Sequence, residues 1–456
     1  MAPSLAPAAP RSWRAWLATS LGALGFLLFG YDTGVIAGAL LFIRGEFALS
    51  PTLEGLVVSV LLCGAAIGGL VSGRLVERHG HRRLLMGTGI LFTLGAAIAA
   101  LAPSVGALVL ARLVLGLAVG AASAQAMLYI SETAPTEHRG AFAALAPLMC
   151  TTGILVSYLV GWCLAESGDW RMMFAVAIVP SLLLVAGMAF APDSPRWLAH
   201  HGRIDAARAV LRGTLPEAEV EPELRRILTV TAAPAVSFTT MLREPVLRHA
   251  LLLACGLALL QQVIGINTIV YYAPTIFRNL GFRPSDAILT TSFLQALAIL
   301  STIVAARIVD RAGRRPLLMA GAVAMAISLA AIGTVMSTPL AQTLAGHVAA
   351  VAAVALFKMA FSFSWGPLVW VTMPEVLPHR ARGTGMGVAT LTNWMANLVV
   401  SFSFPILLAS GAMAVFGVFV GSCLLAFLFA AFVLPETARV SLEAIEQRSP
   451  SPAPSH

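Results

Sequence analysis

The chain is dominated by apolar segments that are long enough to cross a lipid bilayer. A transmembrane helix needs about 20 consecutive apolar residues. About twelve such runs occur, at residues 17–41, 54–73, 84–102, 106–130, 141–164, 171–191, 249–277, 286–309, 316–336, 346–373, 383–408 and 412–433. In hydrocarbon, each backbone polar group must be paired within its own segment or in a closed barrel, so runs of this length are predicted to be helices. We therefore expect an all-α membrane protein of about twelve transmembrane helices.

Composition and the distribution of arginine agree with a lipid environment. Apolar residues make up 58% of the chain and charged residues 11%, and the net charge is +8. The arginines are concentrated in the tails, in alternate loops and in the segment after 191, whereas the remaining loops hold only Arg44, Arg171, Arg278 and Arg283. By the positive-inside rule, both termini are expected in the cytoplasm of a multi-pass protein of the cell inner membrane. This asymmetry accounts for the basic charge without a nucleic-acid partner.

The two halves of the chain repeat each other. Glu77 in the segment ERHGHRR corresponds to Asp310 in DRAGRR, and Glu132 in SETAPTEHRG corresponds to Glu375 in PEVLPHRARG. The three residues PDS at 192–194 likewise correspond to PET at 435–437. Duplicated halves around a central site are typical of alternating-access transporters. We expect a tail at 1–16, six-helix bundles at 17–191 and 249–433, a cytoplasmic connector with short helices at 192–248, and a tail at 434–456.

One acidic residue lies within the first apolar run. An ionised Asp32 at that depth would cost several kcal/mol unless it is paired or protonated, and Arg112 in the fourth run is the candidate partner. Burial favours the neutral carboxyl group and a nearby guanidinium favours the ionised one, so a pair whose separation changes would bind and release a proton. The alternative is a static ion pair that only fixes helix packing.

Polar side chains are concentrated in the second half. Gln261, Gln262 and Asn267 are interrupted by Gly265, which indicates a locally irregular helix that lines a cavity. Carboxamides both donate and accept hydrogen bonds, as sugar hydroxyls do. Trp365 and the pair Asn393-Trp394 add aromatic faces suited to the C–H side of a sugar ring, although each such residue taken singly is more often a packing residue. The single lysine, Lys358, is interpreted as structural, although a long side chain within a membrane run can also extend to the interface, pair with an acid or face a water-filled cavity.

Several motifs resemble one family along nearly the whole chain. They are GYDTGVIAGAL, GRLVERHGHRR, PDSPRW, QQVIGINTIVYYAP, VDRAGRRP and LPETARVSLEAIE. The sequence is similar to the sugar porter family of the major facilitator superfamily, most closely to its bacterial galactose– and xylose–proton symporters. The resemblance implies the major facilitator fold, with two pseudo-symmetric six-helix bundles, and proton-coupled symport of a hexose or pentose by alternating access. It implies no cofactor other than the coupling proton, no metal, and a functional monomer in the lipid bilayer.

The resemblance also implies roles for individual residues. Asp32 would bind the coupling proton and Arg112 would control its protonation. The sugar contacts would be Phe29, Gln261, Gln262, Asn267, Tyr271, Trp365, Asn393 and Trp394. The cytoplasmic gating salt bridges would involve Glu77, Arg78, Arg82, Glu132, Arg139, Asp193, Asp310, Arg311, Arg315, Glu375, Arg382 and Glu436.

Three positions depart from the family pattern. Pro147 stands where sugar porters commonly place a glutamine that contacts the sugar, so the pocket must differ on that side. Ala298 replaces an asparagine, and Gln295, one turn earlier, is the candidate to compensate for it. His81 replaces an arginine of the first loop motif, which weakens that salt-bridge cluster at neutral pH.

Two alternatives to symport remain open at this point. One is facilitated diffusion without protons, against which the acid at position 32 argues. The other is a membrane sugar sensor, although sensors usually carry long cytoplasmic extensions and only a few polar residues follow Glu446. An enzyme is not expected, since the sequence has no nucleophile–base pair, metal cluster or phosphate-binding glycine loop.

Overall fold

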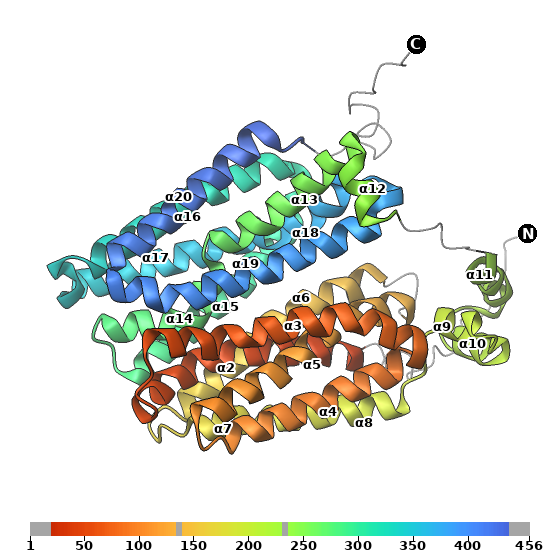
Figure 1. Cartoon of the computed structure of the whole chain (residues 1–456), viewed down its shortest axis with the longest axis horizontal. Helices are drawn as coiled ribbons and strands as arrows, with labels where there is room; N and C mark the ends of the chain where they lie inside the picture. The colour runs from red at the N-terminus through yellow and green to blue at the C-terminus, as the bar shows by residue number, and fades with distance from the viewer. Residues whose placement is uncertain (1–19, 134–138, 230–235, 437–456) are drawn as a thin grey trace, which may run out of the picture. The chain divides into compact units, whose positions relative to one another are not determined.

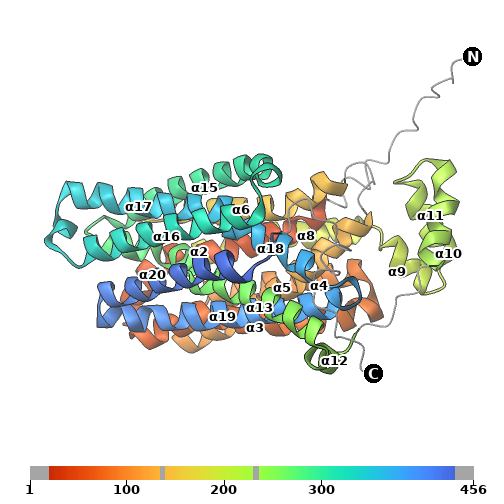
Figure 2. The same ribbon diagram turned by 90° about the horizontal axis from the view of Figure 1, so that it is seen from above.

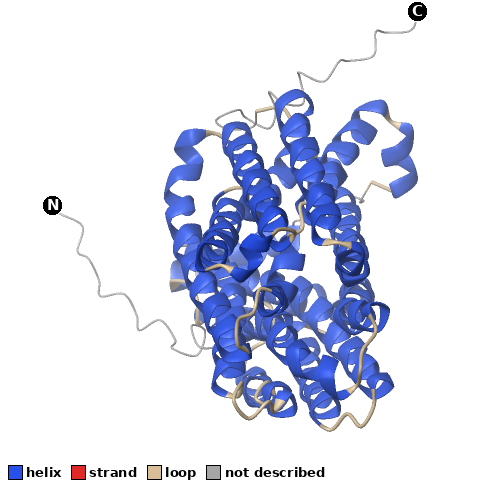
Figure 3. Ribbon diagram, turned by 90° about the vertical axis from the view of Figure 1, so that its left-hand side faces the viewer, coloured by secondary structure: helices blue, strands red, loops and turns tan. Residues whose placement is uncertain are grey.

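The described part of the chain is helical. The computed structural model describes residues 20–133, 139–229 and 236–436, with only the backbone at 139–144 and 305–312. These residues form helices joined by short loops and no strand (Figure 3). The elements are α2 (Leu24–Glu46), α3 (Pro51–His79), α4 (His81–Ala100), α5 (Val105–Thr133), α6 (Arg139–Cys163), α7 (Trp170–Ala175), α8 (Ile178–Phe190), α9 (Pro195–His200), α10 (Ile204–Arg212), α11 (Glu217–Thr229), α12 (Phe238–Arg243), α13 (Pro245–Val263), α14 (Ile266–Asn279), α15 (Pro284–Ala312), α16 (Arg314–Met336), η2 (Pro339–Gln342), α17 (Leu344–Phe363), α18 (Trp365–Val376), η3 (His379–Ala381), α19 (Arg382–Ser410), α20 (Ala412–Leu428) and the π-helical turn η4 (Phe429–Val433).

The predicted transmembrane helices are confirmed. Within the described residues, 12 helical segments are long and apolar enough to span a membrane, and each overlaps one predicted run. Several helices extend beyond the apolar run from which they were predicted. For example, α3 continues to His79 although its apolar run ends at residue 73. Charged side chains at helix ends can reach the polar interface, so the helix outlasts the apolar stretch.

The helices of the second half are broken where the sequence changes character. α13 ends at Val263 and α14 begins at Ile266, and between them Gly265 has a φ of 95°, in the left-handed region that favours glycine. This break confirms the irregular helix predicted from Gly265. A second break lies at Ser364, between α17 and α18.

The chain divides into two compact units. The first unit comprises Met1–Val35, Cys63–Val160 and Asp169–Ala232, and the second comprises Ile36–Leu62, Gly161–Gly168 and Ala233–His456. In the first unit, α4 packs against α5, α7 and α8. In the second, α16 runs alongside α20 (Figure 1) and also packs against α17, while α13 packs against α19.

The segment 192–248, in which short helices were predicted, contains α10 in RIDAARAVLRG and α11 in EPELRRILTV. Together with α9 they form a small group in the first unit, seen in both views (Figures 1 and 2). The group has an apolar core of its own, which consists of Leu198, Ala199, Ala207, Leu211, Val220, Leu224 and Ile227. Ion pairs from Arg208 to Asp205 and Glu221 join α10 to α11 on the exposed side.

Glycines bring α3 and α5 into close contact. A Cβ atom added at Gly64 would lie 2.4 Å from the carbonyl oxygen of Leu113, and one added at Gly68 would lie 2.2 Å from that of Leu117. A Cβ atom added at Gly73, further along the same helix, would have no atom within 4 Å. Small residues therefore form a close helix contact at Gly64 and Gly68 but not at Gly73.

We expect Gly68→Ala to lower the melting temperature of the purified protein in detergent, because its methyl group would meet the α5 backbone. Overpacking of this kind costs about 1–3 kcal/mol. Gly73→Ala is the matched control on the same helix and should leave the melting temperature unchanged or slightly raised, since alanine favours helix. Equal melting temperatures for the two variants would show that the contact at Gly68 contributes nothing to stability.

Candidate functional site

A buried ion pair joins two membrane-spanning helices of the first unit. Asp32 of α2 is 3% exposed and Arg112 of α5 is 0% exposed. Nη1 of Arg112 lies 3.1 Å from each carboxylate oxygen of Asp32 and 3.3 Å from its backbone oxygen. The pairing predicted from the sequence is confirmed. Because neither charge is exposed, each depends on the other for compensation in a low-dielectric environment.

Glycines on either side of Asp32 fix the position of α2. A Cβ atom at Gly30 would lie 1.9 Å from the carbonyl oxygen of Cys150, and one at Gly34 would lie 2.0 Å from the hydroxyl oxygen of Ser157. The backbone of α2 therefore lies directly against α6, while the carboxylate of Asp32 contacts α5. The motif GYDTG thus supplies the acid together with the small residues that hold its helix in place.

Four carboxamide side chains form one hydrogen-bonded network in the second unit. Gln262 donates to Oδ1 of Asn393 at 3.0 Å and to Oε1 of Gln261 at 3.4 Å, and accepts from Nδ2 of Asn267 at 2.7 Å. Asn393 donates to Oε1 of Gln261 at 2.9 Å and to the carbonyl oxygen of Ala258 at 3.1 Å. The structure thus brings together the four amides that were predicted to contact the sugar, from α13, α14 and α19.

The backbone of α18 is attached to this network. Nε2 of Gln261 donates to the carbonyl oxygen of Trp365 at 2.8 Å and to that of Gly366 at 3.2 Å. Trp365 itself is 0% exposed, and its indole N–H donates to the carbonyl oxygen of Leu318 at 2.9 Å. The indole nitrogen is therefore already engaged by α16, and the whole side chain is covered by the protein in this structure.

The other predicted sugar contacts are divided between the two units. Tyr271 is buried on α14, and Trp394 is half-buried on α19 beside the network residue Asn393. Phe29 is half-buried on α2 in the first unit, one turn before Asp32. Their contact with sugar stays a prediction.

The structure describes the surroundings of Pro147 and Ala298, two of the three departures from the family pattern. α6 continues through Pro147, whose side chain is exposed and whose carbonyl oxygen accepts a hydrogen bond from the hydroxyl of Thr151. Near Ala298, the Nζ of Lys358 on α17 donates to Oε1 of Gln295 on α15 at 2.7 Å, and both side chains are buried. Lys358 therefore has a neutral amide among its contacts.

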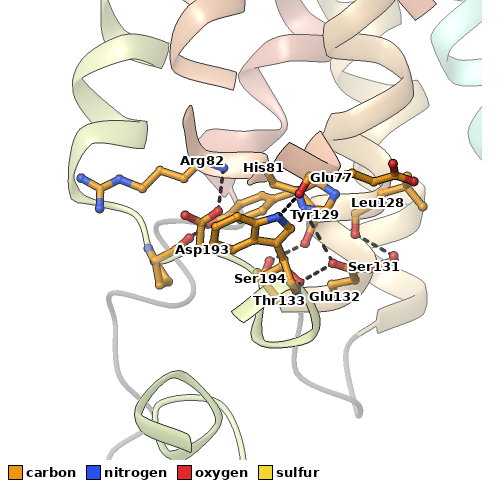
Figure 4. Close-up of polar contacts among 12 residues, drawn as sticks. Glu77, His81, Arg82, Leu128, Tyr129, Ser131, Glu132, Thr133, Asp193 and Ser194 are labelled. Atoms are coloured by element: carbon orange, nitrogen blue, oxygen red, sulfur yellow. Dashed lines mark hydrogen bonds and ion pairs between the residues drawn. The ribbon is translucent and has the colours of Figure 1, made fainter. Parts of the chain in front are cut away.

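The repeated loop motifs build the same structure twice. Oδ1 of Asp193 accepts from the backbone N–H of Arg82 at 3.1 Å, at the start of α4 (Figure 4). In the second unit, Glu436 accepts from the backbone N–H groups of Arg314 and Arg315, at 3.1 Å each, at the start of α16. A carboxylate at a helix N-terminus satisfies free backbone donors and interacts favourably with the helix dipole.

The arginine side chains repeat as well. Arg82 donates to the carbonyl oxygens of Met188 and Ala189 at the end of α8, and Arg315 donates to that of Ala431 in η4. Glycines with positive φ precede both helices, at 83° for Gly80 and 85° for Gly313. The predicted sequence repeat is thus a structural repeat, in which Asp193 and Glu436 bind helix N-termini.

Some of the remaining predicted gating residues form ion pairs or hydrogen bonds and others do not. Glu375 pairs with Arg314 at 3.4 Å, and Glu132 accepts a hydrogen bond from the hydroxyl of Ser194 (Figure 4). Among the described residues, Glu77, Arg78 and Arg382 have side chains in no ion pair. The side chains of Arg139, Asp310 and Arg311 lie outside the described part of the structure.

Some contacts of these clusters were not anticipated. Arg314, rather than its neighbour Arg315, pairs with Glu375. Tyr129 donates to the carbonyl oxygen of Pro192 at 2.9 Å, and the indole of Trp197 donates to that of Glu77 at 3.1 Å. The PDSPRW motif offered a signal for Trp197, whereas Tyr129 lies at the end of an apolar run, just before the repeated segment SETAPTEHRG.

The comparisons with known proteins agree with these features. The model of the family described as "Sugar (and other) transporter" matches residues 18–448. The chain belongs to this sugar transporter family. The putative metabolite transport protein YwtG of Bacillus subtilis is 43% identical over 427 residues, which cover 93% of this chain and 93% of that protein. The galactose-proton symporter of Escherichia coli K12 is 39% identical over 430 residues, covering 94% and 92%.

A solved structure from the sugar transporter family has the same fold. The inward-open xylose transporter XylE from E. coli matches with a TM-score of 0.82 and 27% sequence identity, over 95% of this chain and 99% of that protein. The chain is therefore a multi-pass membrane protein with the major facilitator fold, as the resemblance of the motifs implied.

Proposed function

We propose that this member of the sugar transporter family is a secondary active transporter that carries a monosaccharide together with protons by alternating access. The observation that carries the proposal is the buried pair of Asp32 and Arg112, in which Nη1 lies 3.1 Å from both carboxylate oxygens. The proton-coupled relatives and the matching fold support it.

The pair can couple proton binding to a change of conformation. While Arg112 contacts the carboxylate, Asp32 is stabilised in its ionised form. When the two separate, the buried carboxyl group favours its neutral form and takes up a proton. A helix movement that breaks the contact therefore loads the proton, and one that restores it releases the proton. An uncoupled facilitator would not need an acid at this position.

The amide network supports an uncharged, polyhydroxylated substrate. Gln261, Gln262, Asn267 and Asn393 each carry donors and acceptors, so exchanging one internal bond for a bond to a sugar hydroxyl leaves few groups unsatisfied. The rings of Trp365, Trp394, Tyr271 and Phe29 would pack against the apolar side of the sugar.

The proposal extends to the organisation of the protein in the membrane. The bundles would comprise residues 17–191 and 249–433, joined by a connector at 192–248, with both termini in the cytoplasm and the protein in the cell inner membrane. The clusters around Asp193 and Glu436 would lie at the cytoplasmic end and gate it. The protein would act as a monomer, catalyse no chemical reaction and need no cofactor other than the proton.

Proteoliposomes test this function directly. We expect one sugar of a panel of hexoses, pentoses and polyols to raise the melting temperature of the purified protein, because a ligand that binds only the native state stabilises it. Adding the same sugar to proteoliposomes should drive protons inward, as seen with a pH-sensitive dye in the lumen. Sugar uptake without proton movement would instead establish a facilitator.

A further inference from the structure

His81 occupies a buried position within the cluster at the start of α4. It is 5% exposed, and its ring lies 6.2 Å from that of Tyr129 on α5, measured between ring centroids. Among the described residues, neither ring nitrogen of His81 has a hydrogen-bond partner. Nδ1 lies 3.9 Å from Oε2 of Glu132, too far for a hydrogen bond but close enough for a strong interaction if the ring carries a charge (Figure 4).

Two carboxylates lie near His81, those of Glu132 and Asp193. Among the described residues, no arginine or lysine side chain is in contact with either of them. Glu132, at the end of α5, accepts from the hydroxyl of Ser194, and Asp193, after α8, accepts from the backbone N–H of Arg82. The guanidinium of Arg82 donates instead to backbone carbonyls of α8. Both carboxylates therefore receive hydrogen bonds from neutral donors, and a protonated imidazole would place a positive charge beside Glu132.

Among the described residues, the other titratable groups nearby do not compete for this role. At the end of α3, Glu77 and Arg78 are exposed, and His79 is in contact with the carbonyl oxygen of Leu75. Arg83, on α4 itself, takes part in no ion pair among the described residues. On α9, the indole N–H of Trp197 donates to the backbone carbonyl oxygen of Glu77.

We propose that His81 is a second proton-binding site, distinct from Asp32, and that its protonation binds α4 to the end of α5 and so slows the opening of this end of the transporter. In its charged form the imidazole donates from both nitrogens, one of which can approach Glu132. An arginine at this position would hold the contact at every pH, whereas a histidine, which gains and loses a proton, makes the contact depend on pH.

The consequence for transport rests on the proposed function, which places this cluster at the cytoplasmic end. Symport delivers protons to the cytoplasm. As the cytoplasmic pH falls, a larger fraction of His81 is protonated, the cluster tightens and import slows. As the pH rises, the proton leaves, the contact with Glu132 weakens and import recovers. The device would limit acidification by the transporter itself.

Hydrogen–deuterium exchange tests the site without any sugar. Exchange should be measured at about pH 4.5 and about pH 7.5, a range wide enough for a histidine whose pKa burial shifts from its ordinary value of about 6.5, and corrected for intrinsic exchange rates. We expect amides of 129–133 and 193–200 to exchange roughly fivefold or more slowly at the lower pH in the wild type. His81→Gln should remove this difference, and His81→Arg should give slow exchange at both pH values. His79→Gln, which alters a histidine two residues away, should behave as the wild type.

A wild type without the pH difference, or a His81→Gln variant that keeps it, would overturn the proposal. Counterflow of radiolabelled D-galactose or D-xylose in proteoliposomes, with equal pH on both sides, then measures the effect on transport. The wild-type rate should fall at low pH and the His81→Gln rate should not. Absence of counterflow with every sugar tested would count against the proposed function, while the exchange experiment would still decide the role of His81.

Discussion

Asp32→Asn is expected to abolish uphill sugar accumulation while leaving exchange of sugar across the membrane. Asparagine has nearly the same shape and can still accept a hydrogen bond from Arg112, but it cannot be ionised and so cannot carry a proton. Proteoliposomes with an imposed proton gradient should fill with labelled sugar only to the external concentration. The measurement is the ratio of internal to external sugar at steady state.

Counterflow in the same preparation provides the control, because it requires binding and conformational change but no net proton movement. An Asp32→Asn variant that exchanges sugar but does not accumulate it has lost coupling alone. Asp32→Glu, which keeps an acid, should retain part of the accumulation. Undiminished uphill uptake by the asparagine variant would show that the coupling proton binds elsewhere.

Gln262→Ala is expected to raise the apparent dissociation constant for the transported sugar by about tenfold or more, since a lost buried hydrogen bond costs about 1–3 kcal/mol. Gln262 contacts three other amides of the network, so its loss also leaves Asn267 and Asn393 short of a partner. Sugar binding can be measured by titration of the purified protein, using the sugar that stabilises the wild type most.

Gln125→Ala is the matched control for this variant. Gln125 is also a buried glutamine of a membrane helix, where it donates to the hydroxyl of Ser72 at 3.0 Å in the first unit, outside the amide network. Its replacement should lower stability without changing the dissociation constant. Equal affinity in the wild type and Gln262→Ala would place the sugar away from this network.

The ion pair could be predicted because charged residues are rare within the apolar runs. An acid at Asp32 needs a partner in the membrane, and the sequence offers few basic residues at membrane depth. The amides were predicted to act together from their spacing on one segment and their resemblance to family motifs. Their pairing with Asn393, over 100 residues away, depends on how α13 and α19 are rotated against each other, which no local pattern specifies.

Where several partners were available, the sequence could not choose between them. Lys358 had no evident partner, and the structure gives it Gln295, on another helix. Glu375 lies in a segment with two arginines of its own, Arg380 and Arg382, and the structure pairs it instead with Arg314 at the start of α16. Asp193 and Glu436 were expected in salt bridges, and the structure shows them bound to backbone N–H groups.

The sequence by itself determined the number of membrane helices, the internal repeat and the family, because these follow from the length of apolar runs and from motifs that persist in one dimension. Only the tertiary structure decided which polar groups meet. Those contacts depend on helix register and rotation, set by close packing such as that of Gly30 and Gly34 against α6. The ring of His81, whose nitrogens have no hydrogen-bond partner among the described residues, became visible in the same way, since hydrogen bonding in a buried cluster is a property of the packed helices.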